Sequence, residues 1–277
     1  MGSPESGPID SVTTGTDKLL IDFPAEAVAR LTISIPDKRN ALDHDVLDAI
    51  SSTLPRLDRG IDIRCLIVTG ADPVFSAGYD ISSIADESFE RDAEALVAHP
   101  FTAALEALDA FPWPTVAALN GHCLGGGLEL AITCDLRICA AGAKLGMPPA
   151  KLGLIYGHTG LMRFIETIGA PRTRELFFTG NNLEAKRAEA INLVNRVVPD
   201  GEIGPESVEL ARGIAENAPL STRGNKRAIA TIVANPVLSP EQEAELVELR
   251  ESCFASADFH EGIAAFGEKR KPRWTGR

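Results

Sequence analysis

Three consecutive glycines, Gly125 to Gly127, constrain this chain more than any other feature. They follow an apolar, strand-like run over residues 115–119 and precede an apolar segment, 128–132, that only Glu129 interrupts. A glycine run that opens a helix leaves backbone N–H groups uncovered at the positive end of the helix dipole. Such a place suits an oxygen atom that becomes negative during a reaction.

Glycine also permits a tight strand-to-helix turn, and for the glycines alone this structural interpretation carries most weight. Glu129 favours a functional interpretation instead, because a charged residue in an apolar segment is rarely fully buried unless it is paired or functional. The chain contains neither G-x-G-x-x-G nor G-x-x-x-x-G-K-[ST]. The dinucleotide-binding and P-loop fingerprints are therefore excluded.

The composition and net charge of the chain limit the partners that it can bind and the compartment in which it is expected. The chain has 277 residues and a formal net charge of −12, which disfavours binding to nucleic acid or to an anionic membrane through charge. Its five cysteines form no C-x-x-C pair, which is typical of a reduced, cytoplasmic protein. No apolar run is long enough to span a bilayer. Residues 1–17 lack an apolar segment and are predicted to be a disordered tail, not a signal or transit peptide.

Periodicity predicts an α/β domain over residues 18–204 and a helical region over 205–277. Strands are expected at 18–23, 28–35, 64–69, 136–140 and 196–198, with 144–149 extended. Helices are expected from Asp43 to about residue 57 and at 161–168, 172–179 and 184–191. The remaining helices are expected at 206–217, 219–235, 239–256 and 258–268, where apolar residues such as Leu246, Leu249 and Phe254 predict self-association.

A second glycine turn lies in the run V-F-S-A-G-Y-D-I, residues 74–81, where Gly78 indicates unusual backbone torsion or a closely approaching ligand. Gly78-Tyr79 and Gly125-Gly126 each offer an N–H group beside a glycine at a strand end. Two converging donors of this kind would form an oxyanion hole. With a carboxylate alongside, the reaction indicated is that of a carbonyl compound passing through an enolate.

These motifs together resemble the crotonase superfamily, the enoyl-CoA hydratase/isomerase family. The resemblance covers nearly the whole chain and rests on P-D-K-R-N-A-L at 36–42, A-G-Y-D-I at 77–81, P-W-P-T-V-A-A-L-N-G-H-C-L-G-G-G-L-E-L at 112–130 and C-D-L-R at 134–137. It continues with I-N-L-V-N-R-V-V at 191–198 and H-E-G-I-A-A-F-G-E-K-R-K-P at 260–272. The family implies a spiral of stacked ββα units, a helical C-terminal region that assembles trimers or dimers of trimers, and acyl-CoA substrates.

By position, the resemblance implies that Tyr79 and Gly126 provide the oxyanion-hole N–H groups and that Glu129 is the first catalytic glutamate. It implies no metal, and coenzyme A only as part of the substrate. Phe266 and Lys269 match residues that reach a neighbouring subunit's coenzyme A, although an ordinary amphipathic helix explains them equally well. The full set of implied substrate-binding residues is Lys38, Arg39, Ala41, Ala77, Asp80, Ile81, Gly125, Pro149, Phe266 and Lys269.

One position departs from the family pattern. The second glutamate of typical hydratases falls on Pro149, which has no proton to exchange, so the two-carboxylate addition of water lacks one partner. The stretch P-A-K-L-G-L-I-Y resembles the methylmalonyl-CoA decarboxylase branch, in which proline also replaces the glutamate and a tyrosine follows seven residues later. That tyrosine would be Tyr156, with a half-buried structural tyrosine as the equal alternative.

Three functions therefore remain open. The first is an enoyl-CoA hydratase or isomerase that stabilises a thioester enolate, since double-bond migration needs only one well-placed carboxylate. The second is a decarboxylase of malonyl-CoA-type thioesters. The third is an acyl-CoA-binding protein without activity, which would gain little from keeping Glu129 desolvated.

Overall fold

The computed structural model describes residues 13–60, 62–80, 97–235 and 237–277. Of the predicted tail, residues 1–12 lie outside this range, whereas Thr14 is buried and its hydroxyl donates a hydrogen bond to the carbonyl of Leu19 at 2.5 Å. None of the helices described is long and apolar enough to cross a membrane.

The larger of two sheets has the order β1-β2-β3-β4-β6-β9. Its strands are β1 (Leu19–Ala25), β2 (Val28–Ile33), β3 (Cys65–Gly70), β4 (Thr115–Leu119), β6 (Leu136–Ala140) and β9 (Arg196–Val198). β1 and β2 form an antiparallel hairpin and every other pair is parallel. The smaller sheet has the order β5-β7-β8, with β5 (Cys123–Leu124), β7 (Lys144–Gly146) and β8 (Leu183–Glu184).

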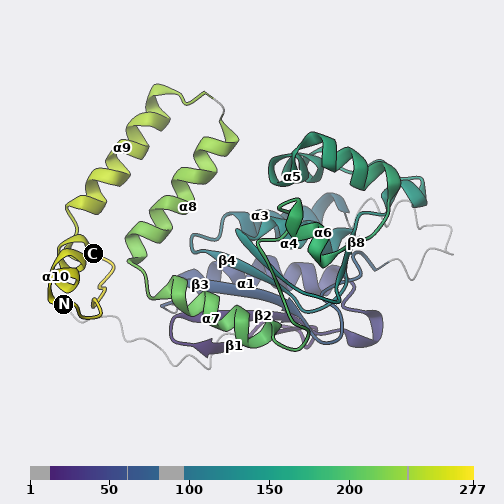
Figure 1. Ribbon diagram of the computed structural model, residues 1–277, viewed down its shortest axis with the longest axis horizontal. Helices are drawn as coiled ribbons and strands as arrows, with labels where there is room; N and C mark the ends of the chain where they lie inside the picture. Colours follow the sequence, from purple (N-terminus) through teal and green to yellow (C-terminus); the bar gives the residue numbers. More distant parts are fainter. Residues whose placement is uncertain (1–12, 61, 81–96, 236) are drawn as a thin grey trace.

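From β4 onward the chain alternates between the two sheets and forms a spiral. β4, β6 and β9 lie in the larger sheet, whereas β5, β7 and β8 lie in the smaller one (Figure 1). β4 and β5 lead into α4 (Gly126–Thr133), and β6 and β7 lead into the 3-10 turn Pro149–Leu152 and α5 (His158–Thr179). α6 (Ala185–Ala190) follows β8. The predicted spiral of stacked ββα units is confirmed by this topology and by the solved structures that it resembles, described below.

The large sheet is buried on both faces, which explains the continuous apolar runs of its parallel strands. On β3, Leu66 and Val68 face a core that also contains side chains of α1 (His44–Gly60), α3 (Thr102–Asp109) and α4. Cys65 and Ile67 face the opposite side, where Ala211 of α7 (Ile203–Ala215) joins a second core. Alternation of period two thus divides β3 between the two cores.

Some predicted elements differ from the observed ones. The run 144–149 is extended only as far as Gly146, because Pro149 begins the 3-10 turn, and its fixed φ suits a first helical position. The two helices expected at 161–168 and 172–179 are both observed, because α5 consists of two helical segments separated at Gly169, where φ is 76° and ψ is 155°. In the second glycine turn, Ser76 and Tyr79 form isolated bridges to Cys123 and Leu42, respectively.

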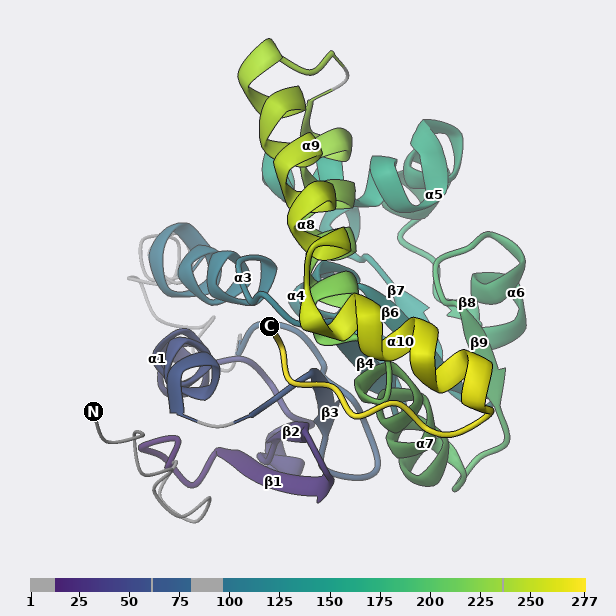
Figure 2. The same ribbon diagram turned by 90° about the vertical axis from the view of Figure 1, so that its left-hand side faces the viewer.

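The C-terminal helices α8 (Pro219–Ala234), α9 (Pro240–Phe254) and α10 (Ala257–Glu268) extend away from the body (Figures 1 and 2). Lys226 anchors α8 to the sheet layer, since its ammonium lies 2.8 Å from the Asp135 carboxylate and 3.0 Å from the Trp113 carbonyl. α9 has no buried residue. Because α7 packs on the sheet, only the helices after it stand apart, and the predicted boundary near 205 remains a prediction.

Arg137 ties β6 to its surroundings and generates a test of the fold. It is 7% exposed, and its guanidinium donates to the carbonyls of Leu193 at 2.8 Å and Cys134 at 2.7 Å. Arg137→Lys retains the charge, but a single ammonium cannot serve both directions, so a buried carbonyl is left unsatisfied. We expect a loss of about 1–3 kcal/mol in the free energy of unfolding.

Urea titration at one fixed protein concentration measures this loss. Arg196→Lys is the control, because Arg196 is exposed on β9 and pairs only with Glu206 at 3.3 Å. The control should change stability by less than about 0.5 kcal/mol. Equal losses in the two variants would contradict the role assigned to Arg137.

Candidate active site

The glycine run forms the start of α4, a helix in which all eight residues are buried. Gly125 precedes the helix with φ 52° and ψ −126°, a conformation that favours glycine. A Cβ atom on Gly126 would lie 2.9 Å from Cε1 of Tyr79, so the ring of Tyr79 occupies the space that a side chain would need. The first N–H groups of α4 have no partner within the helix.

The second glycine turn lies directly against this helix start. Gly78 has φ +93°, and a Cβ atom there would be 3.1 Å from the backbone nitrogen of Gly126. The N–H of Leu42 donates to the Gly78 carbonyl at 2.8 Å, and the N–H of Asp80 donates to the Leu42 carbonyl at 3.1 Å. Because successive N–H groups of an extended segment point to opposite sides, the N–H of Tyr79 points away from Leu42.

Glu129 lies in the first turn of α4 and is 4% exposed. Its carboxylate accepts a short hydrogen bond from the hydroxyl of Tyr156. Gly160 of α5 completes the contact, because a Cβ atom there would lie 2.7 Å from Oε1 of Glu129 and 2.6 Å from Cε1 of Tyr156. The Tyr156 ring packs edge-on against Phe177, with ring centroids 5.4 Å apart. The fold thus brings the two residues predicted to be catalytic into direct contact.

Burial dominates the electrostatics of this cluster. It raises the pKa of Glu129, and the hydrogen bond from Tyr156 and the positive charge of Arg163 offset only part of this shift. Burial likewise raises the pKa of Tyr156 well above its ordinary value, and burial followed by the charge of Glu129 raises the pKa of Tyr79. Both phenols therefore keep their protons at neutral pH, and Glu129 is the group suited to exchange a proton.

The loop of residues 36–41 lies beside the Gly78 turn, because the N–H of Ala77 donates to the Arg39 carbonyl at 3.0 Å. Lys38 and Arg39 are exposed, and the Lys38 ammonium lies 2.7 Å from the Asp80 carboxylate. Ala41 is buried with 6% exposure. Of the predicted binding residues, Ile81 lies outside the described residues.

Pro149 is buried, and its carbonyl accepts a hydrogen bond from the N–H of Leu154 at 3.0 Å. Phe266 and Lys269 lie at the end of α10, on the opposite side of the molecule from α5 (Figure 1). Phe266 is 88% exposed. Within one chain, the structure therefore does not bring these two residues to Glu129.

Two contacts and two buried residues at the site were not predicted from the sequence. The Tyr79 ring covers Gly126 and packs edge-on against Phe101 at 4.8 Å. Asn40 and Ser76 are fully buried polar residues beside the Gly78 turn. The only sequence signal for these two was their place within the P-D-K-R-N-A-L and F-S-A-G segments.

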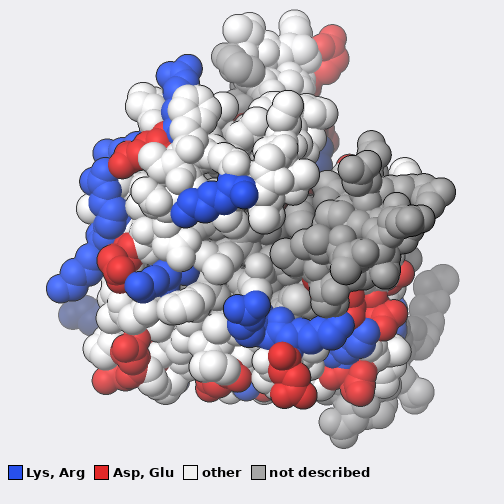
Figure 3. Space-filling model, turned by 90° about the vertical axis from the view of Figure 1, so that its right-hand side faces the viewer, with Lys and Arg blue, Asp and Glu red and all other residues white. Residues whose placement is uncertain are grey.

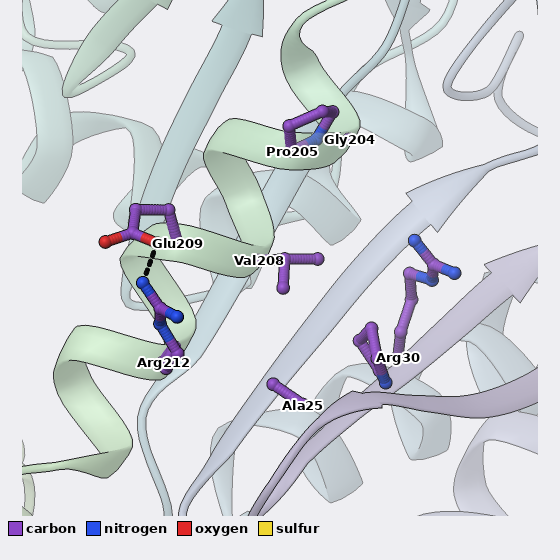
Figure 4. A pocket seen from close by; sticks show the side chains of 8 residues that line it. Ala25, Arg30, Gly204, Pro205, Val208, Glu209 and Arg212 are labelled. Carbon is purple, nitrogen blue, oxygen red and sulfur yellow. Dashed lines mark hydrogen bonds and ion pairs between the residues drawn. The ribbon is translucent and has the colours of Figure 1, made fainter.

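Other surface features do not add to this site. A cavity of about 420 Å³ between the β1–β2 hairpin and α7 is lined by Arg30 and Arg212, which already pair with Asp22 and Glu209 (Figure 4). Figure 3 shows Lys and Arg side chains spread over one face, with Asp and Glu mainly at its lower edge and left side. Within the part of the chain that is described, no three His, Cys, Asp or Glu residues group as a metal site requires.

The raised pKa of Glu129 predicts a stability change. A carboxyl whose pKa rises on folding destabilises the folded state above that pKa, because its charged form is desolvated there. Glu129→Gln should therefore raise the free energy of unfolding at pH 7.5, and the gain should shrink as the pH falls through the pKa of the folded protein. Urea unfolding at several pH values measures it. Glu166→Gln, at an exposed position of α5, should show no such pH-dependent gain, and a loss of stability in Glu129→Gln at pH 7.5 would contradict the assignment.

Comparison with known proteins agrees with this geometry. The sequence profile of the family described as "Enoyl-CoA hydratase/isomerase" matches residues 24–277. The chain is 37% identical to the Mycobacterium tuberculosis protein named "Probable enoyl-CoA hydratase echA8", over 91% of this chain and 96% of that protein. It superimposes on the crystal structure of enoyl-CoA hydratase from Bacillus anthracis with a TM-score of 0.86 and 30% identity, covering 94% of this chain and 100% of the other. The chain therefore belongs to the enoyl-CoA hydratase/isomerase family of the crotonase superfamily.

Proposed function

We propose that this family member is an acyl-CoA enzyme that stabilises a thioester enolate. The thioester oxygen would bind between the N–H groups of Tyr79 and Gly126, and Glu129 would move the proton. The observation that carries the proposal is a buried carboxylate in the first turn of α4, beside the N–H of Gly126 and the Gly78 turn packed against it. Donors held in place before reaction need no reorganisation when the oxyanion forms.

The described residues place one carboxylate, that of Glu129, beside the N–H of Gly126, which favours double-bond migration over addition of water. In migration, Glu129 removes a proton from Cα of a 3-enoyl thioester, the electron pair moves into the thioester as a dienolate, and the same proton returns to Cγ. In hydration by two glutamates, a second carboxylate would hold the water, and Pro149 provides none. Whether the net reaction is that of an isomerase or a lyase is part of this proposal.

Tyr156 would act on Glu129 in this reaction. Its hydroxyl already donates to the carboxylate, so it would orient one oxygen and leave the other to face the substrate. In decarboxylation of a malonyl-CoA-type thioester, the same hydroxyl would have to leave Glu129 to orient the departing carboxylate. The hydrogen bond therefore favours proton transfer over decarboxylation.

Coenzyme A would enter as part of the substrate and lie along the loop of residues 36–41. The exposed Lys38 and Arg39 would pair with its phosphates, and Ala41, Ala77, Asp80 and Gly125 would line the path to Glu129. Phosphate would compete with Asp80 for the Lys38 ammonium. The five cysteines are all free, which supports a reducing compartment, and we propose the cytoplasm.

The chain would assemble as a homotrimer or a dimer of trimers through α8, α9 and α10. These helices expose many large apolar side chains, including Ile229, Ile232, Phe254, Ile263 and Phe266. Such a surface usually marks a protein interface. Assembly would also bring Phe266 and Lys269 to the coenzyme A of a neighbouring subunit.

Turnover with crotonyl-CoA, a 3-enoyl-CoA and methylmalonyl-CoA tests the reaction. We expect the 3-enoyl-CoA to be the best substrate, and Glu129→Gln to lower its kcat by about 10²- to 10⁴-fold with little change in affinity. Tyr156→Phe should have a smaller effect, because it removes only the group that orients Glu129. Pro149→Glu, a restored second carboxylate, should raise hydration of crotonyl-CoA.

Each contrary result of this panel has a definite meaning. A larger loss in Tyr156→Phe than in Glu129→Gln, with methylmalonyl-CoA as best substrate, would support the decarboxylase instead. Binding without turnover on all three substrates would support an inactive acyl-CoA-binding protein. Full activity of both single variants on the best substrate would contradict this site.

Light scattering tests the assembly. We expect a mass of three or six chains at micromolar concentration, because the apolar faces of α8–α10 are too exposed for a stable monomer. Ile232→Asp should lower the mass by placing a charge in the interface, whereas Leu20→Asp, at an apolar position of β1 exposed to a similar degree, should not. A monomer of the unchanged chain would refute the proposed interface.

A further inference from the structure

Ser76 contacts both backbone segments of the proposed oxyanion hole, the Gly78 turn and the glycine run before α4. Its backbone pairs with the strand that leads into the glycine run, because its N–H donates to the His122 carbonyl at 3.3 Å and its carbonyl accepts the N–H of Leu124 at 3.0 Å. A Cβ atom on Gly127 would lie 2.6 Å from Cβ of Ser76. Ser76 therefore packs directly on the start of α4.

The side chain of Ser76 reaches in the other direction. Its hydroxyl donates to the Asn40 carbonyl at 2.7 Å and accepts the N–H of Gly78 at 3.1 Å. All of Ser76 is buried, with 0% exposure. The N–H of Gly78 is thereby held by a partner inside the protein, which fixes the Ala77–Gly78 peptide, while the N–H of Leu42 holds the carbonyl of the following Gly78–Tyr79 peptide at 2.8 Å.

Asn40 holds the other end of this hydrogen-bond chain. It is 0% exposed and has φ 53°, a left-handed conformation that asparagine adopts more readily than most residues. Its amide oxygen accepts the N–H of Ile35 at 2.9 Å, and its amide nitrogen donates to the carbonyls of Ala71 and Val74, each at 2.7 Å. Each polar atom of the side chain is thus satisfied by backbone, which fixes Asn40 rigidly.

We propose that Asn40 and Ser76 are positioning residues that hold the N–H of Tyr79 in place against the N–H of Gly126. The proposal rests on the proposed enolate-stabilising function and adds the device that aligns its donors. Neither side chain would touch the substrate. Without the Ser76 hydroxyl, the N–H of Gly78 would lose its buried acceptor, and the Ala77–Gly78 peptide could rotate and displace the next peptide, which carries the N–H of Tyr79. A displacement of about 1 Å at a catalytic group can cost roughly 10²-fold in rate.

The test uses Ser76→Ala in the full-length protein with acetoacetyl-CoA as probe. The enolate of this 1,3-dicarbonyl thioester absorbs in the near ultraviolet and carries the negative charge that an oxyanion hole stabilises. We expect the unchanged protein to raise the bound enolate fraction and Ser76→Ala to weaken enolate binding by about 10- to 100-fold. Affinity for butanoyl-CoA, whose acyl group carries no charge, should change by less than about threefold. In turnover, kcat should fall with KM nearly unchanged.

Ser207→Ala is the matched control. Ser207 is 2% exposed, and its hydroxyl donates to the Gly204 carbonyl at 2.8 Å within α7, so this variant also deletes a buried serine hydroxyl. It should lower the free energy of unfolding to a similar extent but leave enolate binding unchanged. Ser76→Cys retains a weak donor and acceptor and should fall between Ser76→Ala and the unchanged protein. It also serves if Ser76→Ala fails to fold.

Asn40→Gly tests the second member, because glycine accepts the left-handed backbone conformation while the side-chain hydrogen bonds disappear. The double variant with Ser76→Ala should weaken enolate binding by less than the product of the two single effects, as expected for residues that act as one device. If Ser76→Ala or Ser76→Cys binds the enolate as tightly as the unchanged protein, the role proposed for Asn40 and Ser76 is wrong, but the proposed oxyanion hole is not affected. If the unchanged protein binds acetoacetyl-CoA without raising its enolate fraction, the proposed oxyanion hole itself is wrong.

Discussion

The close approach of two glycine turns is the constraint on which the rest of the site depends. A Cβ atom on Gly78 would lie 2.9 Å from the Leu124 carbonyl and 3.1 Å from the nitrogen of Gly126, so any larger residue would push the segments apart. The parallel sheet makes this approach possible, because β3 and β4 are neighbours and both turns follow their carboxyl ends. Ligand sites of α/β sheets commonly lie at such ends.

The same packing buries Glu129, and this burial disfavours the charged form of its carboxylate. A carboxylate in an almost fully buried helix turn is desolvated, which raises its pKa, and the helix N-terminus and the Tyr156 hydroxyl compensate only in part. The two tyrosines around it stay protonated for the same reason. The site thus combines one group able to exchange a proton with two that hold theirs, which fits the proposed proton transfer by Glu129.

Local pattern predicted most of the fold and much of the site. The short, mainly apolar runs of β3 and β6 and the glycines before α4 are local signals, and the family resemblance supplied the spiral. The contact between Glu129 and Tyr156 was not predictable, because it depends on how the start of α5, at Gly160, packs against α4. Asn40 and Ser76 escaped notice because a small polar residue in a loop has no periodicity, and its burial becomes visible only once distant segments are packed.

Hydrogen exchange at the substrate tests the central claim most directly. In the proposed mechanism, Glu129 and the donors at Tyr79 and Gly126 together acidify the Cα protons of a bound thioester. With butanoyl-CoA in D₂O, followed by NMR, this mechanism predicts incorporation of deuterium at Cα by the unchanged protein. It also predicts that Glu129→Gln lowers the rate of incorporation by about 10²-fold or more. An absence of exchange in the unchanged protein, or equal rates in the two proteins, would contradict it.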